Sequence, residues 1–131
     1  MSFLAKAYAG RTLDLTVTIK TDSGGYLQLA ADDVVRVKVG RAGAAAIDLD
    51  SVAATANGSV VTVDEVGDGS ATHASVTVRL AQGDLSGMQG AYSMEVLVVD
   101  NSETAPADAI KAAEIGVLNV LPTQDGDVGL T

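Results

Sequence analysis

Apolar and polar residues alternate with a period of two along much of this chain. The alternation is most regular over residues 12–20, where leucine, valine and isoleucine fill the odd positions and threonine, aspartate and lysine fill the even ones. It returns over residues 91–100, where tyrosine, methionine and valine share one set of alternate positions. Because successive side chains of a strand point to opposite faces, both segments are predicted to be strands that bury one face in a core.

Shorter alternating segments, separated by turn sequences, predict the remaining strands. Asn57-Gly58 and the Gly-Asp-Gly-Ser sequence at residues 67–70 are turn signals, since asparagine and glycine tolerate positive φ. Such signals recur at intervals of roughly 8–12 residues, a spacing typical of an antiparallel sandwich of about seven to nine strands. The further strands are expected at residues 26–30, 34–40, 46–50, 59–66, 72–80 and 110–121, the last with a bulge at Gly116.

The length of the chain suits a single domain. A chain of 131 residues buries about two thirds of its unfolded surface on folding. We predict one domain over residues 1–122, because Pro122 closes the last strand. Residues 1–9 are either a short first strand or a loose N-terminal arm, and residues 123–131 are expected to form a flexible tail.

An irregular, glycine-broken passage over residues 82–90 leads into the strand at residues 91–100. A long corner before a strand that opens with tyrosine resembles the tyrosine corner of immunoglobulin-like sandwiches, whose tyrosine hydroxyl bonds to upstream backbone. We expect Tyr92 to form such a structural corner with Asp84 and Leu85. The predicted fold class is therefore all-β, an immunoglobulin-like antiparallel β-sandwich of seven to nine strands.

Charge and composition exclude several partners and chemistries. Seventeen acidic residues against eight basic ones give a net charge of -9, and no basic cluster is present, so neither nucleic acid nor an anionic membrane is expected as a partner. Cysteine is absent, which excludes disulfides and thiolate chemistry. The sequence shows no apolar block of a signal peptide and no run of ~20 apolar residues, so we expect synthesis in a cytoplasm.

Residues that could support catalysis are few. His73 is the single histidine, no G-x-S-x-G sequence supplies a nucleophile elbow, and His73 is predicted to face solvent on a strand. Aromatic residues make up 3% of the chain, too few to line a sugar cleft or a cofactor pocket. We therefore expect no catalytic residues, no cofactor and no metal ligands, and we predict that the protein is not an enzyme.

Three acidic clusters are candidates for calcium binding: Asp48 with Asp50, Asp64 with Glu65 and Asp68, and Asp125 with Asp127. Calcium requires six to eight oxygen ligands, and none of these clusters has the complete EF-hand pattern. Acidic side chains at hairpin tips also protect sheet edges from stray pairing. We favour edge protection, and a weak calcium site at either of the first two clusters stays open.

Apolar residues near both ends of the chain are candidate docking arms: Phe3 and Leu4, and Val128 and Leu130. Arms of this kind dock on neighbouring subunits in many assemblies, although simple disorder of the termini explains them equally well. The sequence therefore leaves both readings of the two termini open.

The order of these segments resembles the small immunoglobulin-like domains of tailed-bacteriophage virions. It is most similar to the N-terminal regions of baseplate upper proteins and to related head or tail accessory proteins. The resemblance covers roughly residues 10–121 as an order of elements. It is carried by these segments: Thr-Leu-Asp-Leu-Thr-Val-Thr-Ile at 12–19, the valine-rich segment at 29–39, Val-x-Val-x-Leu at 76–80, Asp84-Leu85, and Gly-Ala-Tyr-Ser-Met-Glu-Val at 90–96.

This resemblance implies a non-enzymatic structural virion protein, made in the host cytoplasm and located in the particle. It would serve as a head decoration, neck, tail or baseplate accessory through protein–protein contacts with other capsid, neck or tail subunits, as a homo-oligomer in the assembled particle. The chain lacks the long C-terminal assembly region of baseplate proteins, which favours a stand-alone accessory protein. The alternative is a carbohydrate-binding or adhesion β-sandwich module of a bacterial surface system.

Overall fold

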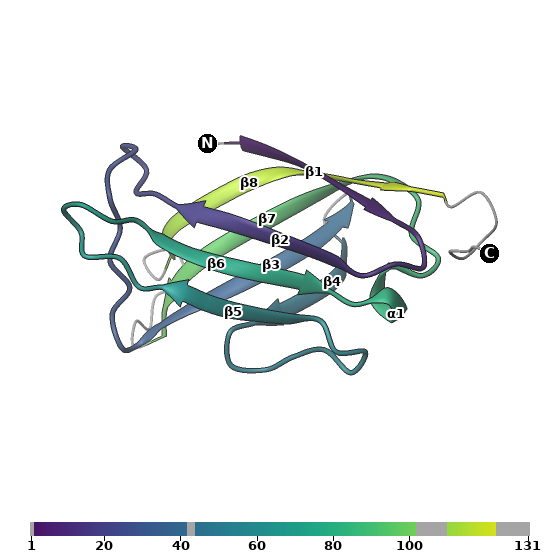
Figure 1. Ribbon diagram of the computed structural model, residues 1–131, viewed down its shortest axis with the longest axis horizontal. Helices are drawn as coiled ribbons and strands as arrows, with labels where there is room; N and C mark the ends of the chain where they lie inside the picture. The colour runs from purple at the N-terminus through teal and green to yellow at the C-terminus, as the bar shows by residue number, and fades with distance from the viewer. Residues whose placement is uncertain (1, 42–43, 102–109, 123–131) are drawn as a thin grey trace.

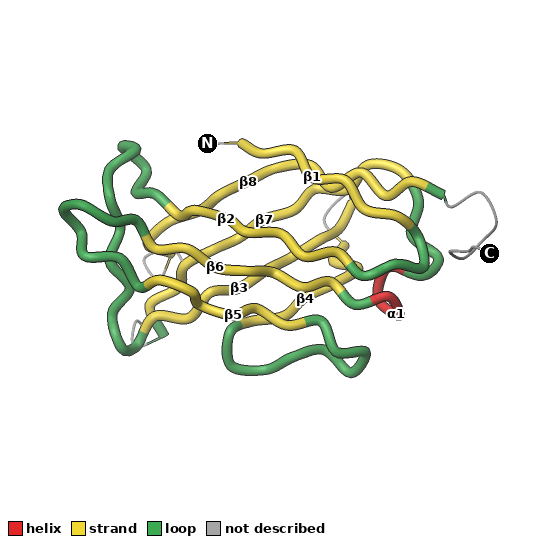
Figure 2. Tube along the Cα trace, viewed as in Figure 1, coloured by secondary structure: helices red, strands yellow, loops and turns green. Residues whose placement is uncertain are grey.

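A computed structural model describes residues 2–41, 44–101 and 110–122 of the protein. This part of the chain forms eight strands and one short helix (Figure 1, Figure 2). The elements are β1 (Ser2–Tyr8), β2 (Leu13–Ile19), β3 (Asp33–Arg41), β4 (Ala44–Asp50), β5 (Val60–Glu65), β6 (Ala74–Leu80), α1 (Gln82–Leu85), β7 (Gly90–Asp100) and β8 (Ile110–Leu121).

The strands form two facing sheets, one of five strands in the order β1-β8-β7-β3-β4 and one of three in the order β2-β6-β5 (Figure 1). All neighbours are antiparallel except β1 and β8, which run parallel. This order matches the variable-type immunoglobulin arrangement, in which an additional strand extends one sheet beyond its central strands. The predicted immunoglobulin-like antiparallel β-sandwich is confirmed.

The core lies between the sheets and consists of valine, leucine, isoleucine, alanine and methionine side chains. Alternate residues of β3, β6 and β7 are almost completely buried, as the period-two pattern predicts. β2 departs from this regularity, because Val17 and Ile19 are buried whereas Leu13 and Leu15 are only half-buried. The first half of β2 therefore lies at the margin of the core.

Two sequence predictions about local structure are wrong. Residues 26–30 do not form a strand, and Tyr26 makes only an isolated bridge to Lys20. The irregularity between β7 and β8 falls between Val98 and Val99, not at Gly116. Gly116 instead permits the close approach of β1, because a Cβ atom there would lie 2.3 Å from the carbonyl oxygen of Phe3.

The N-terminal segment is a strand of the sandwich, not a loose arm. β1 pairs with β8 along its whole length, from Ser2 opposite Ile115 to Tyr8 opposite Leu121. Phe3 and Leu4 therefore belong to the five-stranded sheet, and the docking-arm reading of these two residues is corrected. The tail at residues 123–131, which includes Val128, Leu130 and the third acidic cluster, lies outside the described residues.

Candidate functional site

The corner before β7 is closed by an arginine from β3. The hydroxyl of Tyr92 accepts a hydrogen bond from the backbone N–H of Gln89 at 3.1 Å. The guanidinium of Arg41 lies 3.8 Å from the centre of the Tyr92 ring and donates to the carbonyl oxygens of Ala91, at 2.9 Å, and Gln89. Arg41 thus stabilises the corner through both the Tyr92 ring and the backbone carbonyls. The sequence does not indicate this role.

Asp84 lies in α1 and ties the corner to the loop before β5. It accepts hydrogen bonds from Thr55 Oγ1 at 2.5 Å, from Asn57 Nδ2 at 2.9 Å and from Ser59 Oγ. Burial raises the pKa of Asp84, but the hydrogen bonds from Asn57, Ser59 and Thr55 outweigh it and hold the pKa below its usual value. Leu85, the next residue, is fully buried. These contacts give Asp84 and Leu85 a structural role.

His73 is not a solvent-facing strand residue, which corrects the sequence prediction. It precedes β6 in a half-buried position, and its ring lies 4.0 Å from that of Tyr26. Its Nε2 atom is buried and has no hydrogen-bond partner among the described residues. His73 follows the tight turn between β5 and β6 and packs against the Tyr26 ring. These two features explain its position at the end of the sandwich.

The acidic clusters direct their carboxylates to the protein itself. Arg36 binds both oxygens of Asp48, at 3.1 and 3.0 Å, whereas Asp50 accepts from the backbone N–H groups of the two residues 52 and 53. Asp64 accepts from Thr77 Oγ1 at 2.6 Å. Among the residues that the structure describes, no group of three or more potential metal ligands is brought together.

Asp68 stabilises the turn between β5 and β6, and this contact should make stability depend on pH. Hydrogen bonds from the backbone N–H groups of Ala71, Thr72 and Ser70 lower its pKa to about 2. An unfolded aspartate has a pKa of about 3.9, so the contribution of ionised Asp68 is complete above about pH 4 and is lost as the pH falls toward 2.

We therefore expect the free energy of unfolding to fall less steeply between about pH 4 and pH 2 in Asp68→Ala than in the wild type. Urea unfolding at a series of pH values measures both slopes. Equal slopes in the two proteins would show that the turn contacts of Asp68 contribute nothing to acid sensitivity.

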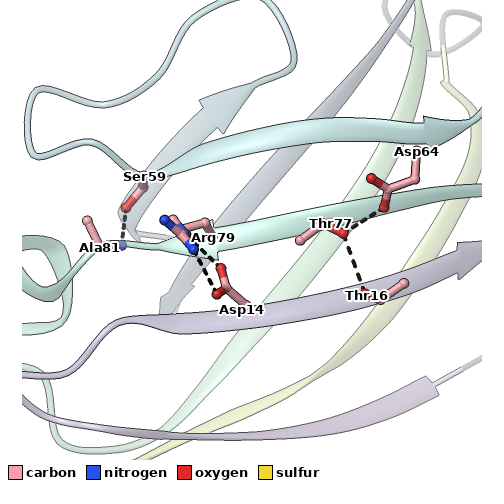
Figure 3. A network of polar contacts seen from close by, with 7 residues as sticks. All are labelled: Asp14, Thr16, Ser59, Asp64, Thr77, Arg79 and Ala81. Atoms are coloured by element: carbon pink, nitrogen blue, oxygen red, sulfur yellow. Dashed lines mark hydrogen bonds and ion pairs between the residues drawn. The ribbon is translucent and has the colours of Figure 1, made fainter.

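The outer face of the three-stranded sheet is polar and its groups bind one another (Figure 3). Arg79 of β6 forms a two-point ion pair with Asp14 of β2, at 2.8 and 3.0 Å. Thr77 donates to Asp64 and lies 3.5 Å from Thr16. This face therefore offers little apolar surface, and five of its polar side chains, Asp14, Thr16, Asp64, Thr77 and Arg79, contact one another.

The outer face of the five-stranded sheet carries an apolar strip, which we define as Leu4, Leu97, Ile115 and Val117. Leu4 is 79% exposed, Ile115 48% and Val117 42%. Leu4 lies opposite Val117 in the pairing of β1 with β8, and Leu97 of β7 lies diagonally across from Ile115. The strip thus crosses three adjacent strands as one continuous surface.

Charged side chains border the apolar strip on β7, β3 and β4. Glu95 lies opposite Ile115 on one side and Lys38 on the other, and Lys38 in turn lies opposite Asp48. Asp48 is also paired with Arg36 at 3.0 Å. An apolar surface with a polar border is the usual composition of a protein–protein contact site.

Comparison with known proteins assigns no family to the chain and finds low similarity to solved structures. No family model and no curated protein matches the chain. A structure of the ZIG-8–RIG-5 IG1–IG1 heterodimer is similar over 92% of this chain and 83% of that chain, at 13% identity and a TM-score of 0.45. A structure from a photo-crosslinking analysis of multimeric cell-adhesive interactions of VGSC beta subunits is similar over 93% and 92%, at 10% identity and a TM-score of 0.43.

These values are low, and the strand order alone defines the class. The protein is an immunoglobulin-like β-sandwich with one polar outer face and one outer face that carries an exposed apolar strip. No helix of the described chain is both long and apolar enough to cross a membrane.

Proposed function

We propose that the protein is a non-enzymatic structural module that acts through protein–protein contacts made by the apolar strip. The observation that carries this proposal is the difference between the two outer faces. The face of the three-stranded sheet is covered by side chains that bind one another, whereas the other face exposes Leu4, Ile115 and Val117 side by side. Covering such a strip releases water from apolar surface and favours association.

More specifically, we propose that the module belongs to the particle of a tailed bacteriophage, where the apolar strip docks on a neighbouring capsid, neck or tail subunit. The support for this assignment is the order of segments that resembles virion sandwiches. An adhesion module of a bacterial surface system is the second candidate, because an apolar strip with a charged border serves recognition at a cell surface equally well. The location of the protein distinguishes the two candidates.

Substitution of Val117 by lysine is expected to prevent incorporation of the protein into particles. Lysine would place a charge at the centre of the contact and require its desolvation, which should reduce binding by at least about tenfold. The measurement is quantitative mass spectrometry of particles purified from cells whose native gene carries Val117→Lys. The wild-type gene, treated identically, gives the reference amount.

Thr62→Lys is the matched control, because Thr62 is exposed on β5, on the polar face of the other sheet. We expect this variant to enter particles as the wild type does. Particles that contain no wild-type protein would contradict the virion assignment, and its recovery on the cell surface would support adhesion. Equal incorporation of both variants would contradict the role of the apolar strip.

A further inference from the structure

The three-stranded sheet has an open edge at β2. β2 pairs with β6 on one side, and no strand of the described chain pairs with it on the other. Its register with β6 is unbroken over all seven residues of the strand. The opposite edge strand, β5, is interrupted by a register shift between Val63 and Glu65. A regular, uninterrupted edge strand is a template for pairing with a further strand.

The backbone of Thr16 and Thr18 faces this open edge. The N–H group of Lys20, which follows β2, donates to Oε2 of Glu114 in the other sheet at 3.2 Å. Backbone groups of alternate residues in a strand point to the same side, so Thr18 and Thr16 direct theirs away from β6 as well. Glu114 thus accepts the hydrogen bond of the last edge-facing N–H group, that of Lys20. The edge-facing N–H groups of Thr16 and Thr18 remain available for a partner strand.

A groove of about 180 Å³ lies beside this edge, between β2 and β1. Phe3 and Leu4 line it from β1, and Leu15 and Val17 line it from β2. Leu15 remains half-buried, although it belongs to the inward-facing set of β2. A strand added at the edge would cover Leu15 and complete this margin of the core.

We propose that the occupant of this edge is β2 of a second copy of the chain, paired antiparallel about a two-fold axis at Val17. In this register Val17 lies opposite Val17 of the partner subunit, Thr16 opposite Thr18, and Leu15 opposite Ile19. Inward-facing residues therefore meet inward-facing residues, as a continuous sheet requires. The two three-stranded sheets would join into one sheet across an interface that is identical from both sides.

Charge complementarity selects a second copy and this register. Asp14 and Lys20 stand at opposite ends of the edge, three residues from Val17 on either side. The antiparallel pair therefore places each Asp14, which also binds Arg79 of its own subunit, opposite Lys20 of the partner subunit, once at each end. Opposite charges directly across a strand pair stabilise it. A centre at Thr16 would place both charges opposite threonines. A centre at Thr18 would place Asp14 opposite Asp22, two like charges.

This inference goes beyond the proposed function and does not depend on it. The edge of β2 belongs to the three-stranded sheet, whereas the apolar strip lies on the outer face of the five-stranded sheet. Leu4 belongs to the apolar strip and also lines the groove beside β2. A dimer formed through β2 would leave Leu97, Ile115 and Val117 of both strips accessible. It would therefore present two copies of the contact surface to a neighbouring subunit, which raises the effective affinity of a weak contact.

Sedimentation equilibrium of the purified protein is expected to give twice the mass of the chain. Thr18→Pro should give the mass of a single chain, because proline removes an edge-facing N–H group and its ring obstructs the partner, while the ladder with β6 is unaffected. Wild-type protein that stays monomeric at millimolar concentration overturns the proposal. A dimer that persists in Thr18→Pro but dissociates in Val117→Lys also overturns it and assigns association to the apolar strip.

A charge exchange tests the register without proline. Asp14→Lys and Lys20→Glu should each weaken dimerisation roughly tenfold, since each places like charges opposite one another at both ends. Mixing the two variants should restore the dimer, because both ends of the mixed pair then carry opposite charges. Failure of the mixture to associate more strongly than either variant alone overturns the register.

A single introduced cysteine tests the position of the two-fold axis. The chain contains no cysteine, so Val17→Cys supplies the only thiol of each subunit. Opposite residues that do not share backbone hydrogen bonds have Cα atoms about 4.5 Å apart, a separation that a disulfide can span. We expect oxidised glutathione to link Val17→Cys into a covalent dimer and to leave Val63→Cys, on edge strand β5, unlinked. Equal linkage of both variants overturns the proposal.

Discussion

Substitution of Gly67 by alanine is expected to lower the free energy of unfolding by about 3 kcal/mol. Gly67 has a φ of +77°, a conformation that disfavours any side chain. A Cβ atom there would also lie 2.2 Å from the carbonyl oxygen of Leu27 and 2.8 Å from the N–H nitrogen of Ala74. These two groups are hydrogen-bonded to each other at 3.2 Å, so the new atom would disrupt that bond. Urea unfolding measures the loss.

Gly58→Ala separates backbone strain from steric overlap. Gly58 has a φ of +96° but nothing within 4 Å of a new Cβ atom, so this variant should lose only about 1–2 kcal/mol, the cost of the backbone conformation alone. A loss of the same size in both variants would show that Leu27 and Ala74 move aside without cost. The predicted contact at Gly67 would then be wrong.

The strands could be predicted because burial on one face forces a period of two. The segments at residues 12–20 and 91–100 keep this pattern along their length, and both are strands in the structure. The segment at residues 26–30 is also predicted to be a strand, but it is a loop in the structure. Only Leu27 is buried there, and the chain crosses from one sheet to the other. A single buried residue in a short segment does not distinguish a strand from a crossing loop.

The corner could be predicted in part. Tyr92 was expected to bond to upstream backbone, and its hydroxyl does accept from Gln89. The role of Arg41 was not predictable, since it lies 50 positions before Ala91, the residue whose carbonyl it binds. Contacts of this range depend on how the strands pair, and the local sequence around Arg41 contains no signal for that pairing.

The sequence of β8 contains a signal for the apolar strip, namely apolar residues at positions that alternate with the buried ones. A search for apolar–polar alternation alone overlooks it. In β8, Ile115 and Val117 are apolar although they alternate with the buried positions 116 and 118. A strand with apolar residues on both faces is either covered on both sides or carries an exposed contact surface. The five-stranded sheet has no layer on its outer face among the described residues, so the second case applies to β8.

The parallel pairing of β1 with β8 could not be predicted, because a parallel partner at a sheet edge produces only a weak pattern in the sequence. The one trace is Gly116, the only glycine between residues 110 and 122. Its lack of a side chain admits the backbone of Phe3. Without knowledge of the pairing, a glycine in the middle of a strand indicates a bulge, and for this reason the sequence predicts one at Gly116.

Substitution of Gly116 by alanine is therefore expected to displace β1 and to lower the free energy of unfolding by about 3 kcal/mol. The new Cβ atom would lie 2.3 Å from the carbonyl oxygen of Phe3 and 2.6 Å from its ring. Movement of the ring cannot relieve the overlap with the backbone, so β1 itself must shift. Urea unfolding measures the loss, and hydrogen exchange should show that β1 loses protection while β6 keeps it.

Val117→Ala is the matched control, because Val117 adjoins the same site but its side chain is partly exposed, and we expect it to lose less than about 1 kcal/mol. Full protection of β1 in Gly116→Ala would contradict the predicted displacement. Displacement of β1 would also carry Leu4 away from the apolar strip and Phe3 away from the groove beside β2. Gly116→Ala should therefore weaken both proposed contacts at once, whereas Thr18→Pro and Val117→Lys each affect only one.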